Sequence, residues 1–301
     1  MLDSEVERSN EESSLYSELN LAMFKSIKQL PLSLQETVTL FLLEYSGIAL
    51  SPNEFFQKYP KAVWVILNDL INKYKYNDTI YKMSVQAQSM SLFIHSLDDH
   101  LCDGQIPLDL AKLHLRTTVW NVFEKTCGNL FSELRVEEDL YEENINIYFS
   151  SSFLESVDSL DDYLNRSKRQ STLWQIVPLM LAASEHRQSV QFIIEQFIMA
   201  YRIIDDLEDW KADAIAGEKS SIYFACSDGQ KGVFSKKNQS DEEYSSLLRQ
   251  TIDDENIFQS LGQVALECLK TSEERAISIG LKTMAVNIKH YQETQKLKWL
   301  F

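Results

Sequence analysis

Residues that interrupt helices are scarce in this chain. Its 301 residues include eight glycines and five prolines, and none of them falls within residues 61–103, 129–177 or 179–216. Such stretches suit long helices, and no segment shows the sustained alternation of a half-buried strand. Apolar residues instead recur at three- and four-residue steps, as at Val190, Ile193, Ile194, Phe197, Tyr201 and Ile204. We therefore predict an all-α fold with one helical domain over residues 15–301.

Cysteines, long apolar runs and targeting signals are also lacking. The four cysteines form no Cys-x-x-Cys pair, which indicates reduced thiols rather than a disulfide scaffold. No run approaches the roughly eighteen apolar residues of a membrane-spanning helix. Residues 1–14 are acidic and polar without an apolar core, so we expect a disordered N-terminus and no signal peptide. We expect a soluble, cytoplasmic protein.

Basic residues are fewer than acidic ones. Lysine and arginine number 29 against 45 aspartates and glutamates, which gives a formal net charge of -16. Nucleic-acid binding normally leaves a basic footprint, so a nucleic-acid partner is not expected. A protein of this charge that binds a phosphorylated ligand needs cations to invert the local field, and clustered carboxylates recruit them.

Two acidic segments have the spacing that such a cation site requires. They read DDHLCD at residues 98–103 and DDLED at residues 205–209. In a helix, side chains four residues apart share a face, and like charges there repel one another. The pairs at this spacing are Asp99 with Asp103 and Asp205 with Asp209. A divalent cation would remove the repulsion, so both segments are candidate metal sites.

The second segment continues an apolar stripe. Asp205 lies four residues beyond Tyr201 and eight beyond Phe197, which predicts a carboxylate on a buried face that needs a partner. The alternative is that both segments are solvated helix ends of an acidic protein. Each segment, however, ends a long apolar helix and precedes a glycine, Gly104 or Gly217. This correspondence favours the metal sites.

The second segment also resembles a known family. Residues 201–213 read YRIIDDLEDWKAD, similar to the F-Q-x-x-D-D-x-x-D-x-x-G-D motif of trans-prenyltransferases, which are class I isoprenoid synthases. Residues 217–221, GEKSS, resemble the G-K-S-T segment that follows it. The first segment resembles the family's D-D-x-x-D motif less closely, because a register from Asp98 places Cys102 at the last aspartate. A register from Asp99 restores both end carboxylates and gives the D-x-x-x-D form of squalene and phytoene synthases.

The resemblance implies a fold, a cofactor and a substrate. It implies a helical bundle of the isoprenoid synthase type with a central active-site cavity, in which Mg²⁺, three ions with the substrate diphosphate, helps to ionise an allylic prenyl diphosphate. The implied catalytic residues are Asp99, Asp103, Asp205 and Asp209, and the metal-binding set adds Asp98 and Asp206. The implied diphosphate-binding residues are Lys168, Arg169, Lys211 and Lys219. The implied prenyl pocket consists of Phe93, Ile94, His95, Trp174, Phe197 and Tyr201.

Two motifs of chain-elongating prenyltransferases have no counterpart here. Residues 15–60 contain no G-G-K-x-x-R-P segment, and residues 105–113 contain no arginine; in the family these motifs hold isopentenyl diphosphate. The second motif favours prenyl transfer with carbon–carbon bond formation, but a terpene cyclase stays an alternative, as does a noncatalytic metal- or partner-binding protein. Homodimers are usual among the proteins that the chain resembles, so we expect one.

Overall fold

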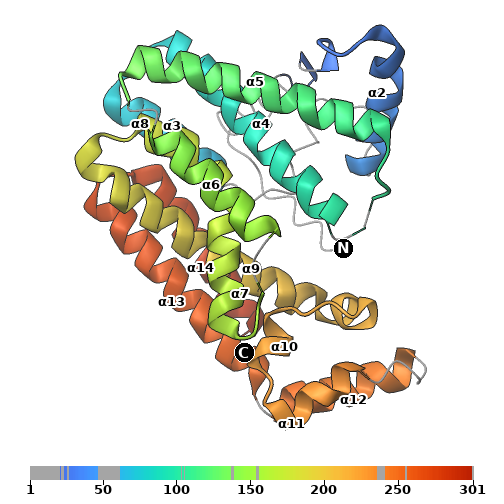
Figure 1. Ribbon diagram of the computed structural model, residues 1–301. Coiled ribbons are helices and arrows are strands. Elements are labelled where there is room, and N and C mark those ends of the chain that lie inside the picture. The colour runs from blue at the N-terminus through green and yellow to red at the C-terminus, as the bar shows by residue number, and fades with distance from the viewer. Residues whose placement is uncertain are drawn as a thin grey trace. The chain divides into compact units, whose positions relative to one another are not determined.

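The structure is a computed structural model, and it is helical throughout its described part (Figure 1). It describes residues 21, 24–25, 27–46, 62–102, 104, 106–136, 139–153, 156–235, 241–254 and 256–299, and no strand occurs among them. The prediction of an all-α fold is confirmed. The predicted disordered segment, residues 1–14, lies outside the described residues. The chain divides into two compact units, Met1–Asn144 with Leu173–Ala183, and Ile145–Thr172 with Ser184–Phe301.

The first unit is centred on two long neighbouring helices, α4 (Asp78–Cys102) and α5 (Leu110–Leu134), which pack along each other. It also contains α2 (Leu32–Ser46), α3 (Ala62–Tyr74), the start of α6 (Asp139–Phe153) and nearly all of α8 (Thr172–Leu181). The core includes large, fully buried side chains such as Trp64, Phe93 and Phe123. Helix α4 therefore has a firm support, and the first acidic segment lies at its C-terminal end.

Helices α3 and α4 are separate, although no glycine or proline stands between them. Lys75 takes the left-handed conformation with φ 56°. The side chain of Asn77 then accepts hydrogen bonds from the backbone N–H groups of Thr79 and Ile80, each at 3.0 Å. An asparagine cap thus starts α4 by satisfying donors that have no partner inside the helix.

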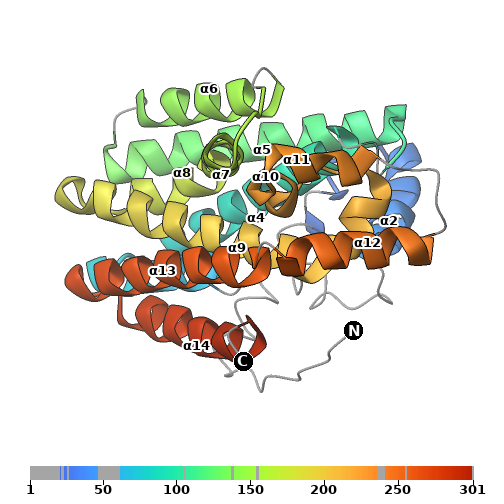
Figure 2. The same ribbon diagram turned by 90° about the horizontal axis from the view of Figure 1, so that it is seen from below.

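The second unit is built on α9 (Arg187–Ala216), α13 (Ile257–Ser278) and α14 (Lys282–Trp299). Figure 2 shows these three helices as successive layers, and α13 packs against both of the others. The shorter elements are the end of α6, α7 (Leu160–Gln170), η1 (Ser184–His186), α10 (Ser221–Ala225), α11 (Asp228–Lys231), η2 (Gly232–Ser235) and α12 (Asp241–Asp254). The glycines and charges of residues 227–235 therefore do not prevent helical turns from forming.

Helix α9 follows the predicted stripe for most of its length. Val190, Ile193 and Phe197 are buried, and the hydroxyl of Ser272 on α13 donates to the carbonyl oxygen of Ile193 at 2.9 Å. Gly217 ends α9 in the left-handed conformation, with φ 81°, which glycine adopts at little cost. The second acidic segment lies in the last three turns before this cap.

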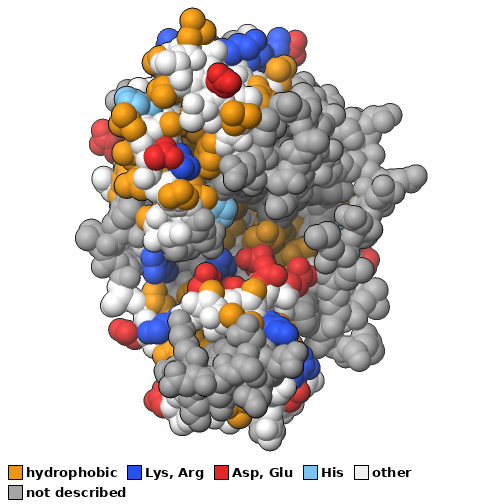
Figure 3. Space-filling model, turned by 90° about the vertical axis from the view of Figure 1, so that its right-hand side faces the viewer, with side chains coloured by type: hydrophobic (Ala, Val, Ile, Leu, Met, Phe, Trp, Pro, Cys, Tyr) orange, Lys and Arg blue, Asp and Glu red, His pale blue; other side chains and the backbone are white. Residues whose placement is uncertain are grey.

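The surface agrees with the charge balance of the sequence. On the face drawn in Figure 3, basic side chains lie scattered among apolar and acidic ones and form no broad basic surface in the described part. Every helix within the described ranges is too short or too polar to cross a bilayer.

Candidate active site

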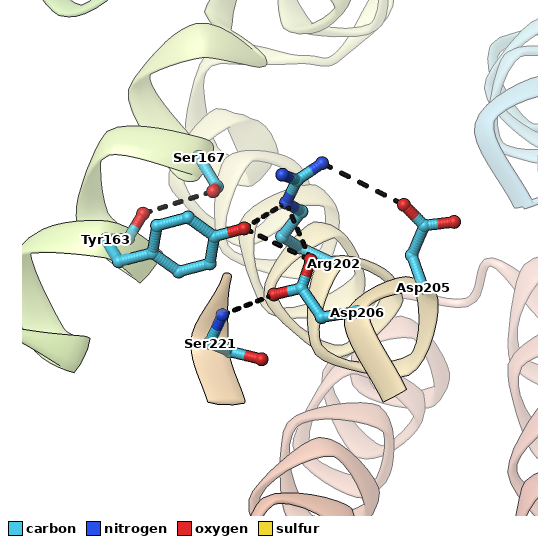
Figure 4. A network of polar contacts seen from close by, with 6 residues as sticks. All are labelled: Tyr163, Ser167, Arg202, Asp205, Asp206 and Ser221. Atoms are coloured by element: carbon cyan, nitrogen blue, oxygen red, sulfur yellow. Dashed lines mark hydrogen bonds and ion pairs between the residues drawn. The ribbon is translucent and has the colours of Figure 1, made fainter. Parts of the chain in front are cut away.

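Asp206 is the structural centre of the second motif. Its side chain is 2% exposed, and its two oxygens have different partners (Figure 4). The Oδ2 atom accepts a hydrogen bond from the backbone N–H of Ser221 at 2.7 Å, and Oδ1 accepts one from the hydroxyl of Tyr163 at 3.1 Å. This single carboxylate therefore joins α9 to α10 and α7.

Arg202, one turn before Asp206, completes the network. Its Nε donates to the hydroxyl oxygen of Tyr163 at 2.5 Å and lies 3.3 Å from Oδ1 of Asp206. Burial raises the pKa of Tyr163, so this hydroxyl stays protonated and can accept from Arg202 while it donates to Asp206. The charge of Asp206 is thus balanced by an arginine on its own helix.

Asp205 lies next to this network but is 44% exposed. The nearest described cation is Arg202, whose Nη1 lies 3.8 Å from Oδ2 of Asp205. Partial burial raises the pKa of the Asp205 carboxyl to about 6, and the charges of Asp206 and Asp209 add to the rise while Arg202 opposes it. Asp209, four residues on, is exposed.

The sequence interpretation misjudged the depth of Asp205. It placed Asp205 on the buried stripe, whereas Asp206 is the buried residue and Asp205 lies at the edge. The reason is helical geometry: each four-residue step advances about 40° beyond a full turn. From Phe197 to Tyr201 to Asp205 the steps therefore turn away from the core, so that Phe197 is buried whereas Tyr201 and Asp205 are half-buried.

The carboxylates of the second motif suit a divalent cation that prefers oxygen ligands, such as Mg²⁺. No three His, Cys, Asp or Glu side chains within the described ranges are placed to share one ion. Asp205 and Asp209 offer two carboxylates on one side of α9, whereas Asp206 is occupied by its three partners. Mg²⁺ commonly binds through one or two carboxylates, with waters and substrate phosphates as the other ligands. These residues fit that pattern.

Further carboxylates make the end of α9 strongly acidic. Asp213 is half-buried, and burial raises its pKa to about 7, with the charges of Asp206 and Glu218 adding to the rise. Glu208 is exposed. A bound cation would therefore be stabilised by several negative charges on one helix.

The first motif also contains one buried and one accessible carboxylate. Asp98 has a side-chain exposure of 6% and forms a two-pronged ion pair with Arg116 of α5. Arg116 Nε donates to Oδ1, and Nη2 donates to Oδ2 at 2.7 Å. Asp99 is half-buried and forms no ion pair with any described residue. Asp103 lies outside the described residues, so the spacing of the Asp99 pair is not observed.

The predicted diphosphate-binding residues, all in or next to the second unit's helices, have different surroundings. Arg169 Nη2 donates to the hydroxyl of Ser150 at 3.3 Å. Burial raises the pKa of the Cys268 thiol to about 11, and the nearby charge of Lys168 opposes that rise. Lys219 is exposed, with Nζ 5.2 Å from the ring centre of Tyr223. Lys211 is exposed and makes no ion pair with the described carboxylates.

The predicted prenyl-pocket residues fall into two groups. In the first unit, Phe93 and Ile94 are fully buried. His95 meets Trp174 edge to face, with ring centres 4.8 Å apart, and Gln88 Nε2 donates to the carbonyl oxygen of Trp174 at 3.2 Å. These contacts hold the start of α8 against α4.

In the second unit, Phe197 and Tyr201 stack with ring centres 6.4 Å apart. Phe197 also packs against Tyr291 of α14, at 5.9 Å. Burial raises the pKa of Tyr291 and of Tyr201, and nearby acidic groups including Asp205 and Glu208 add to the rise. The rings of Tyr201 and Phe197 therefore lie on α9 one and two turns before Asp205.

Sequence reasoning missed several residues that contact the two motifs: Arg116 at the first, and Tyr163, Tyr291 and the part played by Arg202 at the second. Arg202 carried a signal, because it stands where the resembling motif has glutamine. Tyr163 and Arg116 carried none, since their partners, Asp206 and Asp98, are 43 and 18 residues away along the chain.

The comparison with solved structures identifies the fold. No protein-family model matches the sequence, and no curated protein matches it either. Among solved structures, the chain is similar to a geranylgeranyl pyrophosphate synthetase from Pyrococcus horikoshii Ot3, with TM-score 0.66, 11% identity and coverage of 95% of this chain and 96% of the other. It is also similar to a polyprenyl synthetase from Streptomyces coelicolor A3(2), with TM-score 0.69, 12% identity and coverage of 94% and 97%.

A third similar structure is a decaprenyl diphosphate synthase from Rhodobacter capsulatus, with TM-score 0.62, 11% identity and coverage of 93% of this chain and 96% of the other. Coverage is nearly complete in all three comparisons, so the similarity extends over the chain and not only over the motifs. The predicted fold type is confirmed, and the chain has the fold of the class I isoprenoid synthases.

Proposed function

We propose that this protein is a magnesium-dependent enzyme that ionises an allylic isoprenoid diphosphate and transfers the prenyl group with formation of a carbon–carbon bond. The observation that carries the proposal is the division of labour at residues 205–209. Asp206 is buried and bonded to the scaffold, which leaves the half-buried Asp205 and the exposed Asp209 accessible at the spacing of a cation site. This arrangement occurs in a chain with the isoprenoid synthase fold.

The carboxylates have distinct roles in this proposal. Bound Mg²⁺ would stabilise the negative charge that develops on the departing diphosphate. Asp205 and Asp209 would hold it in the second unit, and Asp99 with Asp103 would do so at the first motif. Asp98 and Asp206, also predicted as ligands, are instead assigned to positioning, because their oxygens are engaged by Arg116 and by the Tyr163 network.

The remaining predicted residues would bind the two ends of the substrate. Lys168, Arg169, Lys211 and Lys219 are proposed to contact the diphosphate. Of these, Arg169 is the best held, because α6 orients its guanidinium through Ser150. Aromatic rings stabilise an allylic cation through their π faces and exclude water. Phe197 and Tyr201, stacked beside the second motif, are proposed for this role. The central cavity is part of the same proposal.

The acceptor is less constrained than the ionising step. The chain has no counterpart of the two segments that hold isopentenyl diphosphate in elongating enzymes. That observation favours an acceptor other than isopentenyl diphosphate, or cyclisation of a single prenyl diphosphate. Cytoplasmic location and a homodimer stay predictions.

The test is incubation of the protein with geranyl, farnesyl or geranylgeranyl diphosphate and Mg²⁺, each with and without isopentenyl diphosphate. Release of diphosphate and the organic products are measured. Longer diphosphates would indicate elongation, and hydrocarbons or alcohols from one substrate would indicate cyclisation. The Asp205→Asn variant is the matched control. If the wild type releases no more diphosphate than a protein-free blank under every condition, the protein is a noncatalytic relative. Equal release above the blank by wild type and variant would instead remove Asp205 from the site.

A further inference from the structure

Arg202 has an inner edge that is fixed. Its Nε atom is held by the Tyr163 hydroxyl and by Asp206, and its guanidinium lies over the Tyr163 ring, with Cζ 5.4 Å from the ring centre. The glutamine of the resembling motif is neutral and could not balance the buried charge of Asp206. Arginine at this position therefore adds a permanent positive charge inside the second motif.

The outer edge of the same guanidinium is accessible. The Arg202 side chain is 40% exposed, and Nη1 lies 3.8 Å from Asp205 Oδ2, which is beyond hydrogen-bond distance. A cation at this distance repels a divalent ion that approaches Asp205 and shares the carboxylate's charge. Without substrate, the positive charge of Arg202 thus partly neutralises Asp205, as a metal ion would.

A diphosphate changes this balance. Guanidinium groups bind phosphate oxygens in a two-pronged geometry, and such charge-assisted bonds are stronger than a loose contact with an exposed carboxylate. A diphosphate oxygen can bind the N–H groups of the Nη atoms while Nε keeps its bond to Tyr163, because these are separate donors of one planar group. Asp205 then loses its only described cation neighbour and becomes available to a metal.

We propose that Arg202 is a positioning residue that keeps divalent cations away from Asp205 until a diphosphate binds, so that the second motif takes up metal together with substrate. The inference rests on the proposed function, since it assumes that Asp205 holds metal and that the ligand is a diphosphate. It goes beyond that function by assigning the order of binding to one side chain.

The test measures Mn²⁺ binding by electron paramagnetic resonance, without turnover, in wild-type protein and in Arg202→Gln. Without diphosphate, Arg202→Gln should bind Mn²⁺ at the Asp205 site about tenfold more tightly, because a nearby positive charge has been removed from a partly exposed site. Inorganic pyrophosphate should strengthen Mn²⁺ binding strongly in the wild type and much less in the variant. A merely structural role of Arg202 would predict weaker binding instead.

Three controls keep the outcome unambiguous. Arg202→Lys keeps the charge and, without diphosphate, should bind Mn²⁺ as weakly as the wild type. Arg202→Gln with Asp205→Asn should lose the gain. If Arg202→Gln does not fold because Asp206 is left without its cation, then Asp206→Asn is compared with Arg202→Gln/Asp206→Asn, where the buried charge is absent.

The inference is overturned if a folded variant that lacks Arg202 binds Mn²⁺ no more tightly than its parent. A different result would overturn the proposed function: Mn²⁺ and pyrophosphate binding that is the same in the wild type and in Asp205→Asn. The two failures are therefore distinguishable.

Discussion

The two aspartate pairs, Asp98–Asp99 and Asp205–Asp206, are built from the same parts in opposite order. Each pair has one buried carboxylate bonded to an arginine and one more accessible carboxylate. The buried member is the first residue in one pair and the second in the other. The arginine of the first pair comes from the neighbouring helix α5, whereas that of the second pair comes from the same helix, one turn earlier.

The two arginines therefore hold their buried aspartates in different ways. Arg116 crosses between helices, is 25% exposed and binds both oxygens of Asp98, so it fixes the packing of α4 on α5. Arg202 is 40% exposed and shares the holding of Asp206 with Tyr163 and Ser221. The first arginine therefore joins two helices, and the second is the one that we propose responds to a ligand without releasing the buried carboxylate.

The largest effects on activity are expected at the accessible carboxylate of each pair. Asp99→Asn and Asp205→Asn should each lower kcat about 100- to 1,000-fold, because each removes part of the electrostatic stabilisation of the leaving diphosphate. The melting temperature should stay within a few degrees of wild type, since neither carboxylate is bonded into the core. Steady-state diphosphate release and thermal unfolding check this pair. Near-normal turnover in both variants would remove the site assignment.

The arginines should separate in stability rather than in chemistry. Arg116→Met should lower the free energy of unfolding by about 3 kcal/mol, because it leaves the buried charge of Asp98 without its cation. Arg202→Met should cost about 1 kcal/mol, because Arg202 is partly exposed and Asp206 keeps two other hydrogen bonds. Urea unfolding of both variants gives the comparison. Equal losses would show that the two arginines do not differ as described.

The pH dependence should distinguish Asp205 from an ordinary surface carboxylate. Its folded-state pKa of about 6 lies above the usual 3.8, so between these values the folded protein holds a proton that the unfolded chain releases. This group therefore favours folding more as the pH falls from 7 to 4, and the contribution is lost as the pH rises through 6. After allowing for exposure, the effect is about 1 kcal/mol or less. In EDTA, lowering the pH from 7.5 to 5 should raise the melting temperature of the wild type relative to that of Asp205→Asn. An equal change in both proteins would contradict this prediction.

The smallest effects are expected at the basic residues. Arg169→Ala should raise KM about tenfold, because Arg169 is oriented by Ser150 and a charge-assisted bond contributes about 1.5 kcal/mol or more. Lys211→Ala should raise KM about threefold or less, since exposed and unanchored charges contribute little. Initial rates at varied substrate concentration test the ranking. A larger effect at Lys211 would reverse our view of which residues hold the diphosphate.

The sequence predicted the all-α fold because helical periodicity depends on local spacing. The stripe from Val190 to Phe197 lies on the buried side of α9, as expected from helical periodicity. The same reasoning failed at Asp205, because small angular drifts add up over successive four-residue steps. The break at residues 75–77 was missed because Asn77 caps α4 without a glycine or proline.

Long-range partners lay beyond the reach of sequence reasoning. The bond between Tyr163 and Asp206 joins α7 to α9, and no spacing rule relates residues that the tertiary fold brings together. The departure from glutamine at Arg202 was visible in the sequence. Its meaning required the position of Tyr163, which only the structure provides.

The hydrogen bonds of Asp206 to Ser221 and Tyr163 predict which aspartates can change in related sequences. A descendant that lost catalysis would be free to replace Asp205 and Asp209, which support no neighbouring helix. It would still need Asp206 to keep α7, α9 and α10 joined. In relatives of this chain, retention of the second aspartate without the first would therefore mark a protein that keeps the architecture and lacks the proposed metal site.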